Sequence, residues 1–96
     1  MLNFKEYEKI NKECLDLARK KNKIYGCENL KLLNGLSILV RMNDKISRLN
    51  KLCLDKIKSD INDETIEDTL KDLCNYSIYY LMYLRGALED DQNIKV

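Results

Sequence analysis

The sequence predicts an all-α fold, an antiparallel bundle of three to four helices in a single domain that spans residues 1–96. The chain has no proline and only three glycines, so little in it breaks a helix. Hydrophobic residues make up 45% and charged residues 34%, a balance typical of a folded chain with amphipathic helices. One domain is expected, since domains usually hold about 100–150 residues.

The first helix is expected over residues 4–22. Asn3 is a good N-cap, and Glu6 can close a capping box three positions later. Apolar residues recur along this helix at spacings of three, four and seven: Phe4, Tyr7, Cys14, Leu17 and Ala18. The stretch from residue 22 to residue 34 contains Gly26 and predicts a loop with a short helical turn around residues 30–33.

The second helix is expected over residues 36–58. The third is expected to start after Asn62 and Asp63, which supply its N-cap, and to continue to about Leu88. Beyond Leu73 the third helix is apolar on nearly all sides, which favours burial against a second subunit in a homodimer or higher oligomer. Residues 90–96 are expected to fray. The stripes predicted to face the core are Leu39, Met42, Ile46, Leu49 and Cys53 on the second helix, and Ile66, Leu70, Leu73, Ser77, Leu81 and Leu84 on the third.

Charge is unevenly distributed along the chain, although the net charge is only +1. Residues 1–58 hold fourteen Lys and Arg against seven Asp and Glu, whereas residues 59–96 hold three against nine. Two halves of opposite net charge can pair with each other, or they can lie on either side of a ligand that carries anionic groups. The balanced total argues against a DNA or RNA polymer as partner.

The cysteines and the N-terminus indicate a reducing compartment. The four cysteines form no CxxC pair, and there is no histidine to complete a zinc site or to act as an imidazole acid or base. The N-terminal residues lack the apolar core of a signal peptide, and no run is long enough to span a membrane. We therefore expect a cytoplasmic protein with no membrane partner.

Two charged rows stand out on the later helices. Arg41, Asp44, Lys45 and Arg48 lie at i, i+3, i+4 and i+7, so one face of the second helix carries three cations around one carboxylate. On the third helix an acidic row with a spacing of four consists of Glu64, Asp68 and Asp72. Carboxylates at this spacing repel, so either the cationic row or a divalent metal ion must compensate them. Structural ion pairs between neighbouring helices are the alternative explanation.

Three segments of the chain are similar to segments of a known family. They are Ala18–Gly26, Ile38–Leu49, and Asp63–Leu73 followed by Asn75 and Tyr76. Taken in order, they resemble a phage family called nucleotide-modification-associated domain 1. The resemblance covers about residues 14–85, and the recurrence of all three segments is more specific than any one of them.

This family is similar to the MazG-like all-α NTP pyrophosphohydrolases. The resemblance implies an oligomeric helical bundle and a nucleotide ligand, in enzymes that use Mg²⁺ to split a nucleoside triphosphate into a monophosphate and pyrophosphate. Those enzymes hold the metal with an ExxE pair on one helix and an ExxD pair on the next. This chain departs from that pattern, because the run from Arg41 to Asp44 puts a cation at one of the carboxylate positions.

The candidate site follows from the two rows and the tyrosines. Arg41, Lys45 and Arg48 are expected to bind phosphate oxygens. Tyr25, beside Gly26, and Tyr79, in line with the acidic row, are the expected base-stacking residues. Glu64 and Asp68 are the candidate catalytic residues, and the candidate ligands of one Mg²⁺ ion are Asp44, Glu64, Asp68 and Asp72.

Three functions remain open from the sequence. The first is a Mg²⁺-dependent nucleotide pyrophosphohydrolase of phage origin, located in the host cell cytoplasm. The second is a non-catalytic sponge that sequesters a host immune signalling nucleotide of the cyclic or ADP-ribose type, and so acts in anti-defence. The third is a purely structural helical oligomer.

Overall fold

The computed structural model describes the backbone of residues 1–58 and 63–89 and the side chains of residues 1–54 and 65–89. These ranges are helical apart from short turns and contain no strand, which confirms the all-α class. No helix within them is long and apolar enough to cross a membrane. The elements in chain order are α1 (Phe4–Tyr25), α2 (Glu28–Lys31), the 3₁₀ helix η1 (Leu32–Gly35), α3 (Leu36–Lys58) and α4 (Asp63–Leu84).

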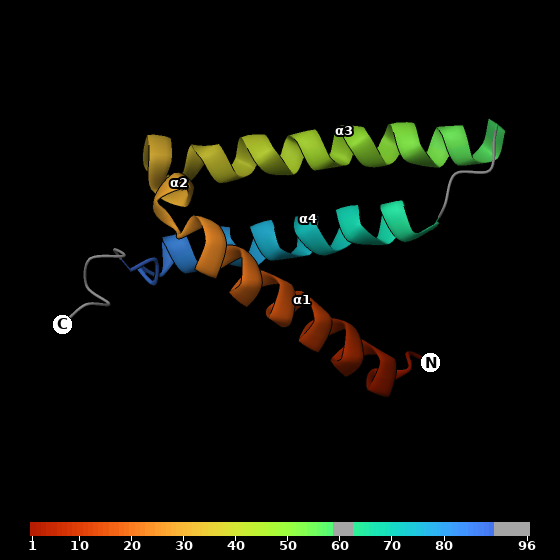
Figure 1. The fold of residues 1–96 in the computed structure, drawn as a ribbon, viewed down its shortest axis with the longest axis horizontal. Coiled ribbons are helices and arrows are strands. Elements are labelled where there is room, and N and C mark those ends of the chain that lie inside the picture. Colours follow the sequence, from red (N-terminus) through yellow and green to blue (C-terminus); the bar gives the residue numbers. More distant parts are fainter. Residues whose placement is uncertain (59–62, 90–96) are drawn as a thin grey trace.

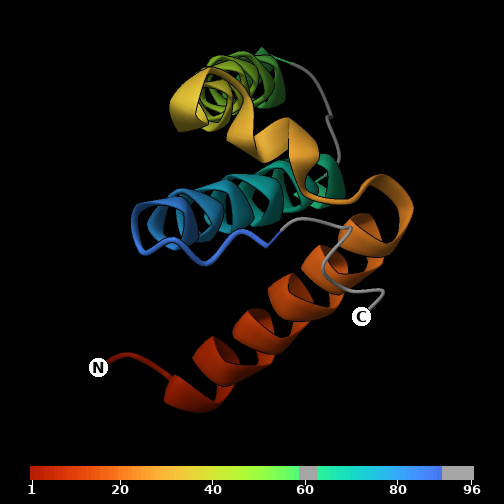
Figure 2. The same ribbon diagram turned by 90° about the vertical axis from the view of Figure 1, so that its left-hand side faces the viewer.

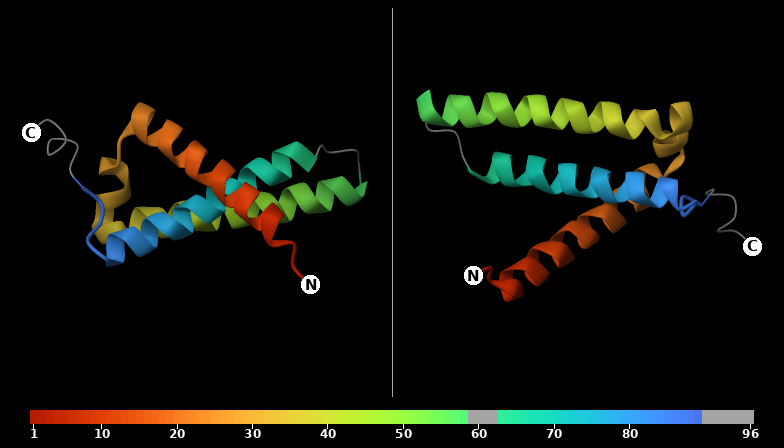
Figure 3. Two further views of the ribbon diagram at one scale, coloured as in Figure 1. Left: turned by 90° about the horizontal axis from the view of Figure 1, so that it is seen from below. Right: turned by 180° about the vertical axis from the view of Figure 1, so that it is seen from behind.

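The long helices α3 and α4 lie side by side and antiparallel, and α1 runs obliquely to them (Figures 1 and 2). Seen from below, α1 crosses α4 (Figure 3), and it packs mainly on α4 rather than on α3. The structure thus contains one antiparallel helix pair with a third helix splayed away from it, instead of a regular bundle. The radius of gyration is 15.4 Å, against about 12.5 Å for a compact chain of this length.

Glycines with positive φ end α1 and α4. Gly26 (φ 68°) follows α1 and donates its backbone N–H to the carbonyl of Asn22 at 2.8 Å, so α1 ends at Tyr25 rather than at residue 22. Gly86 (φ 65°) follows α4, and the N–H of Ala87 donates to the carbonyl of Met82 at 2.8 Å. This Schellman arrangement stops α4 at Leu84 rather than at residue 88.

The other helix ends agree with the sequence prediction. The Oδ1 atom of Asn3 accepts the backbone N–H of Glu6 at 3.2 Å, as expected of the N-cap of α1. Helix α3 covers residues 36–58 as predicted, and α4 begins at Asp63, which was predicted as part of its N-cap. The predicted loop contains more helix than expected, with α2 and η1 in succession, and its last three residues, Leu33, Asn34 and Gly35, all have positive φ.

The inner face of α3 is rotated from the predicted stripe by less than one residue. Ile38 is completely buried and Met42 and Leu49 are half-buried, but Leu39 and Ile46 are exposed. The reason is that Lys45 occupies the inward position next to Asp72 of α4, which displaces the apolar residue at position 46 to the flank.

The predicted inner stripe of α4 is wrong for this chain taken alone. Leu70, Leu81 and Leu84 are 49%, 50% and 63% exposed. The residues that α4 turns toward its neighbours are largely polar, and the buried ones include Thr69 and Asn75. An apolar stripe marks a face that needs covering, and the sequence alone does not say whether the same chain covers it.

Gly35, the last residue of η1, lies against the aromatic ring of Tyr83 in α4. A Cβ atom added to Gly35 would lie 2.8 Å from Cδ2 of Tyr83, and its φ is +82°. Gly86 also has a positive φ (+65°), but a Cβ atom added there would meet nothing within 4 Å. An alanine at position 86 would therefore have a strained backbone only, whereas an alanine at position 35 would have a strained backbone and a steric clash as well.

We predict that Gly35→Ala destabilises the fold more than Gly86→Ala does. Gly86→Ala should cost about 1 kcal/mol, the penalty for a positive φ in a residue with a Cβ. Gly35→Ala should cost about 1–3 kcal/mol more, because the Tyr83 ring must also move. Urea unfolding followed by circular dichroism measures both free energies, and equal losses would contradict the Gly35–Tyr83 contact.

Candidate functional site

Asp72 of α4 connects all three long helices through two lysines. Its Oδ1 atom lies 2.7 Å from Nζ of Lys21 in α1, and its Oδ2 atom lies 3.2 Å from Nζ of Lys45 in α3. The Asp72 side chain is 16% exposed. Burial alone would raise the pKa of Asp72, but hydrogen bonds and charge interactions with Lys21 and Lys45 outweigh burial, so the pKa lies below its ordinary value. Asp72 is therefore a charged carboxylate at neutral pH.

Two further polar contacts hold the middle of α1 on α4. The buried Asn75 side chain donates from Nδ2 to the carbonyl oxygen of Cys14 at 3.0 Å. Lys71 pairs with Glu13 at 2.9 Å, and this contact lowers the pKa of Glu13 and raises that of Lys71. With Asp72, these contacts fix the distance and direction of α1 relative to the helix pair.

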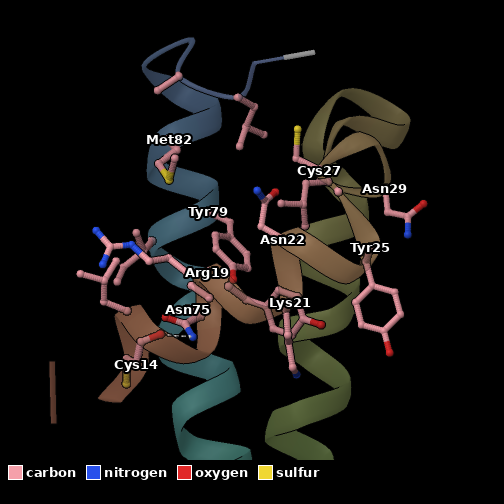
Figure 4. A pocket seen from close by; sticks show the side chains of 18 of the residues that line it. Cys14, Arg19, Lys21, Asn22, Tyr25, Cys27, Asn29, Asn75, Tyr79 and Met82 are labelled. Carbon is pink, nitrogen blue, oxygen red and sulfur yellow. Dashed lines mark hydrogen bonds between the residues drawn. The ribbon is translucent and has the colours of Figure 1, made fainter. Parts of the chain in front are cut away.

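A cavity of about 940 Å³ lies between α1, the α2 corner and α4 (Figure 4). Its wall includes the basic residues Arg19, Lys21 and Arg41 and, among the described residues, a single acidic one, Glu89. Half-buried Tyr79 points into the space between α4 and α1 beside Asn22, whereas Tyr25 is 70% exposed and lies at the rim (Figure 4). The polar amides of this wall are Asn11, Asn22, Asn29 and Asn75.

A second hollow of about 220 Å³ adjoins the larger cavity and contains the predicted cationic row. Its lining consists of Arg41, Asp44, Lys45, Arg48 and Tyr76. Arg41 and Tyr76 line both hollows, so they stand at the junction between them. The sequence therefore placed the three cations on one face correctly, and the structure puts that face beside the tyrosines of α4.

The cations differ in whether an acid already neutralises them. Lys21 and Lys45 share Asp72. Arg19, Arg41 and Arg48 form no ion pair with any acid in the described part of the chain. Three guanidinium groups are thus available to an anion that enters the two hollows, and each can form a bidentate contact with phosphate oxygens.

The carboxylates predicted to bind Mg²⁺ are not assembled among the described side chains. No group of three or more Asp, Glu, Cys or His residues within residues 1–54 and 65–89 is close enough to hold one metal ion. Asp44 lines the smaller hollow, Asp68 is exposed, and both oxygens of Asp72 face lysine ammonium groups. The side chain of Glu64 lies outside the described residues. The described carboxylates are therefore not arranged to coordinate a metal ion, and no metal-dependent catalytic step is assigned to them.

Tyr79 and Tyr76 form an aromatic pair between the two hollows. Their ring centroids are 5.8 Å apart and the planes are nearly perpendicular, at 84°. Burial raises the pKa of Tyr79, and the nearby Tyr76 and Asp72 raise it further, so its hydroxyl is neutral at physiological pH. A neutral phenol can donate a hydrogen bond while its ring faces a ligand.

Sequence reasoning missed Arg19 and Lys21 as site residues. Both belong to the basic end of α1, where a cation has a local explanation in the favourable interaction with the helix dipole. The available signal was spacing, because Lys21 lies seven residues after buried Cys14 and so on the face of α1 that packs on α4.

Comparison with known proteins identifies no relative. No family model, no curated protein and no solved structure matches the chain. The comparisons therefore add no support for a function beyond the geometry of the two hollows and the sequence itself.

We predict that Asp72→Asn lowers the free energy of unfolding by about 2 kcal/mol at pH 7, because two lysines lose their charged partner. A carboxylate with a lowered folded-state pKa stabilises the fold above its unfolded pKa and stops doing so as the pH falls through the folded value. The difference between wild type and Asp72→Asn should therefore shrink as the pH is lowered below about 4, the ordinary pKa of an aspartate.

The matched control is Asp16→Asn, which removes the exposed pair between Lys12 and Asp16 in α1. Exposed pairs of this kind contribute about 0.2–1 kcal/mol, so the control should show a small loss. Chemical denaturation at several pH values measures both variants. A pH-independent difference for Asp72→Asn would contradict the bridging role of its charge.

Proposed function

We propose that this chain is a phage-type nucleotide-binding protein whose two adjoining hollows hold a phosphorylated nucleotide. The observation that carries the proposal is the position of Arg41, which lines both hollows without an acidic partner among the described residues. Arg19 on one side and Arg48 on the other extend the same cationic surface. A ligand with several phosphate groups is the anion that three separated guanidinium groups fit best.

The larger cavity suits the nucleoside part of such a ligand. Its volume of about 940 Å³ falls within the usual range of about 300–1,000 Å³ for small-molecule sites. Tyr79 offers a ring for stacking, and Asn22 of α1 lies beside it as an amide donor and acceptor for base edges. Tyr25 at the rim is the second candidate for stacking. The likeness of three segments to a phage nucleotide-associated family supports the same ligand class.

A protein that binds a nucleotide either hydrolyses it or sequesters it unchanged. Hydrolysis of the MazG-like type would need a carboxylate set that keeps its oxygens free for Mg²⁺. Asp72 instead directs both oxygens at lysines, so its geometry favours a sponge that binds a signalling nucleotide without turnover. Glu64 and Asp68 are the residues on which the enzymatic alternative depends.

We predict that Arg41→Gln raises the dissociation constant for the nucleotide by about 10- to 100-fold, because a hydrogen-bonded charge contact contributes about 1.5–3 kcal/mol. Isothermal titration calorimetry with nucleoside triphosphates, cyclic dinucleotides and ADP-ribose measures the constants. Lys51→Gln is the control, since Lys51 is an exposed cation of α3 that lines neither hollow. Equal effects of the two substitutions, or no binding across the panel, would contradict the proposal.

We predict that the bound nucleotide is recovered chemically intact. The protein is incubated with nucleotide and Mg²⁺ and then denatured, and the released compounds are separated by ion-exchange chromatography. Asp68→Ala should change the affinity by less than about twofold, because Asp68 is exposed and lines neither hollow. Release of monophosphate and pyrophosphate by the wild type, and its loss in Asp68→Ala, would establish the pyrophosphohydrolase instead.

A further inference from the structure

A cysteine of α1 lies opposite a cysteine of α4 where the two helices are in contact. Two polar contacts locate Cys14 on α4: its carbonyl oxygen accepts Nδ2 of Asn75 at 3.0 Å, and the preceding residue Glu13 pairs with Lys71 at 2.9 Å. Cys74 follows Lys71 by three residues and directly precedes Asn75. Positions 71, 74 and 75 share one side of a helix, so the side of α4 that contacts α1 also carries Cys74.

The thiol groups of this pair are neighbours with different access to solvent. Cys14 is 2% exposed, whereas Cys74 is exposed. Burial raises the pKa of the Cys14 thiol, and the charge and hydrogen-bond interactions with the Cys74 thiol raise it further. A dissolved reagent can therefore reach Cys74 first, and Cys14 lies behind it within the helix contact.

The backbones of α1 and α4 approach each other closely at this pair, where α1 crosses α4 (Figure 3). An asparagine side chain is short, yet that of Asn75 reaches the backbone carbonyl of Cys14. A disulfide needs such an approach, because it joins residues whose Cα atoms are usually about 4.4–6.8 Å apart. The crossing of the two helices therefore favours a bond between the two sulfur atoms.

We propose that Cys14 and Cys74 form a reversible disulfide bond that locks α1 onto α4 under oxidising conditions. The co-reactant is a low-molecular-weight disulfide of the glutathione type. The thiolate of Cys74 attacks one sulfur atom of this disulfide, which forms a mixed disulfide on Cys74 and releases one small thiol. The thiolate of Cys14 then attacks Sγ of Cys74 and displaces the second small thiol. Two electrons pass from the cysteines to the small disulfide, and the two thiol protons leave with the two released thiols.

The bond reinforces a helix contact that shapes the larger cavity. Polar contacts hold α1 on α4, and Cys14 itself lines the cavity. A covalent link at Cys14 fixes this wall and also restricts the unfolded chain between the two cysteines. Disulfides in a reducing compartment are usually transient and redox-sensing, which is the kind of bond proposed. The proposal does not depend on what the hollows bind.

The other two cysteines allow the effect of the fold to be separated from chance pairing. Cys27 donates its thiol to the carbonyl oxygen of Glu89 at 2.7 Å, and Cys53 is exposed on α3. Cys14 and Cys74 are farther apart in the sequence than any other two cysteines of the chain. Loop closure in an unfolded chain therefore favours every other pair.

Mass spectrometry of the protein equilibrated with oxidised and reduced glutathione tests the proposal. Trypsin cleaves after lysine and arginine, so digestion without reductant should release residues 13–19 joined to residues 72–85. Wild type should give this linked peptide, and Cys74→Ser should lose it completely. Cys53→Ser is the matched control, since it removes another exposed cysteine and should keep the linked peptide. Circular dichroism confirms that each variant keeps its helix content.

The same oxidation of wild type in urea is a control that needs no variant. In the unfolded chain the linked peptide should give way to pairs of cysteines that are closer in sequence. The oxidised protein should also unfold at a higher urea concentration than the reduced protein, because the bond constrains the unfolded chain.

Each outcome decides the question. A linked peptide that dominates in the folded wild type, is lost in Cys74→Ser and yields to other pairs in urea supports the proposal. Glutathione that stays on Cys74 without the linked peptide overturns it, as do equal yields of several cysteine pairs in the folded protein. Equal urea midpoints of the oxidised and reduced protein overturn the lock. Arg41→Gln should form the bond as wild type does, so failure of nucleotide binding and failure of the disulfide are read independently.

Discussion

The carboxylate of Asp72 is the point on which the arrangement of the three long helices depends. One lysine from α1 and one from α3 meet it, at 2.7 Å and 3.2 Å. Apolar contacts do not replace this link, because Cys14 and Ile38 are the buried apolar residues of the described chain. The direction of α1, and with it the cavity of about 940 Å³, is therefore determined largely by polar contacts from one side of α4.

The basic residues near Asp72 fall into two groups, those that pair with this carboxylate and those that do not. Lys21 and Lys45 are neutralised by Asp72 and act in structure, whereas Arg19, Arg41 and Arg48 have no acidic partner among the described residues. An internal carboxylate that satisfies the lysines keeps the arginines free for an external anion. It also removes Asp72 from any metal site. If the hollows bind a phosphorylated ligand, as we propose, these effects favour its binding over its hydrolysis.

The sequence predicted the elements of this fold better than their orientation. The N-cap at Asn3 and the limits of α3 followed from local chemistry, but the Schellman turn at Gly86 was missed, so α4 was predicted too long. The leucine stripe of α4 was assigned to the core because periodicity reveals an apolar face without revealing its partner. In the site, the cationic row was found on one face, while Lys21 was missed because a basic residue at a helix end already has a local explanation.

The central claim is that the arginines of the two hollows meet the phosphates, and the chain provides its own control. It has four arginines, of which Arg19, Arg41 and Arg48 line the hollows and Arg85 does not. Titration of the wild-type protein with tripolyphosphate, followed by NMR of the arginine Nε–Hε groups, observes all four at once. We expect saturable shifts of Arg41 and Arg48, with a smaller shift of Arg19 and none of Arg85. Shifts of equal size at all four arginines, or no shift at Arg41, would contradict the claim.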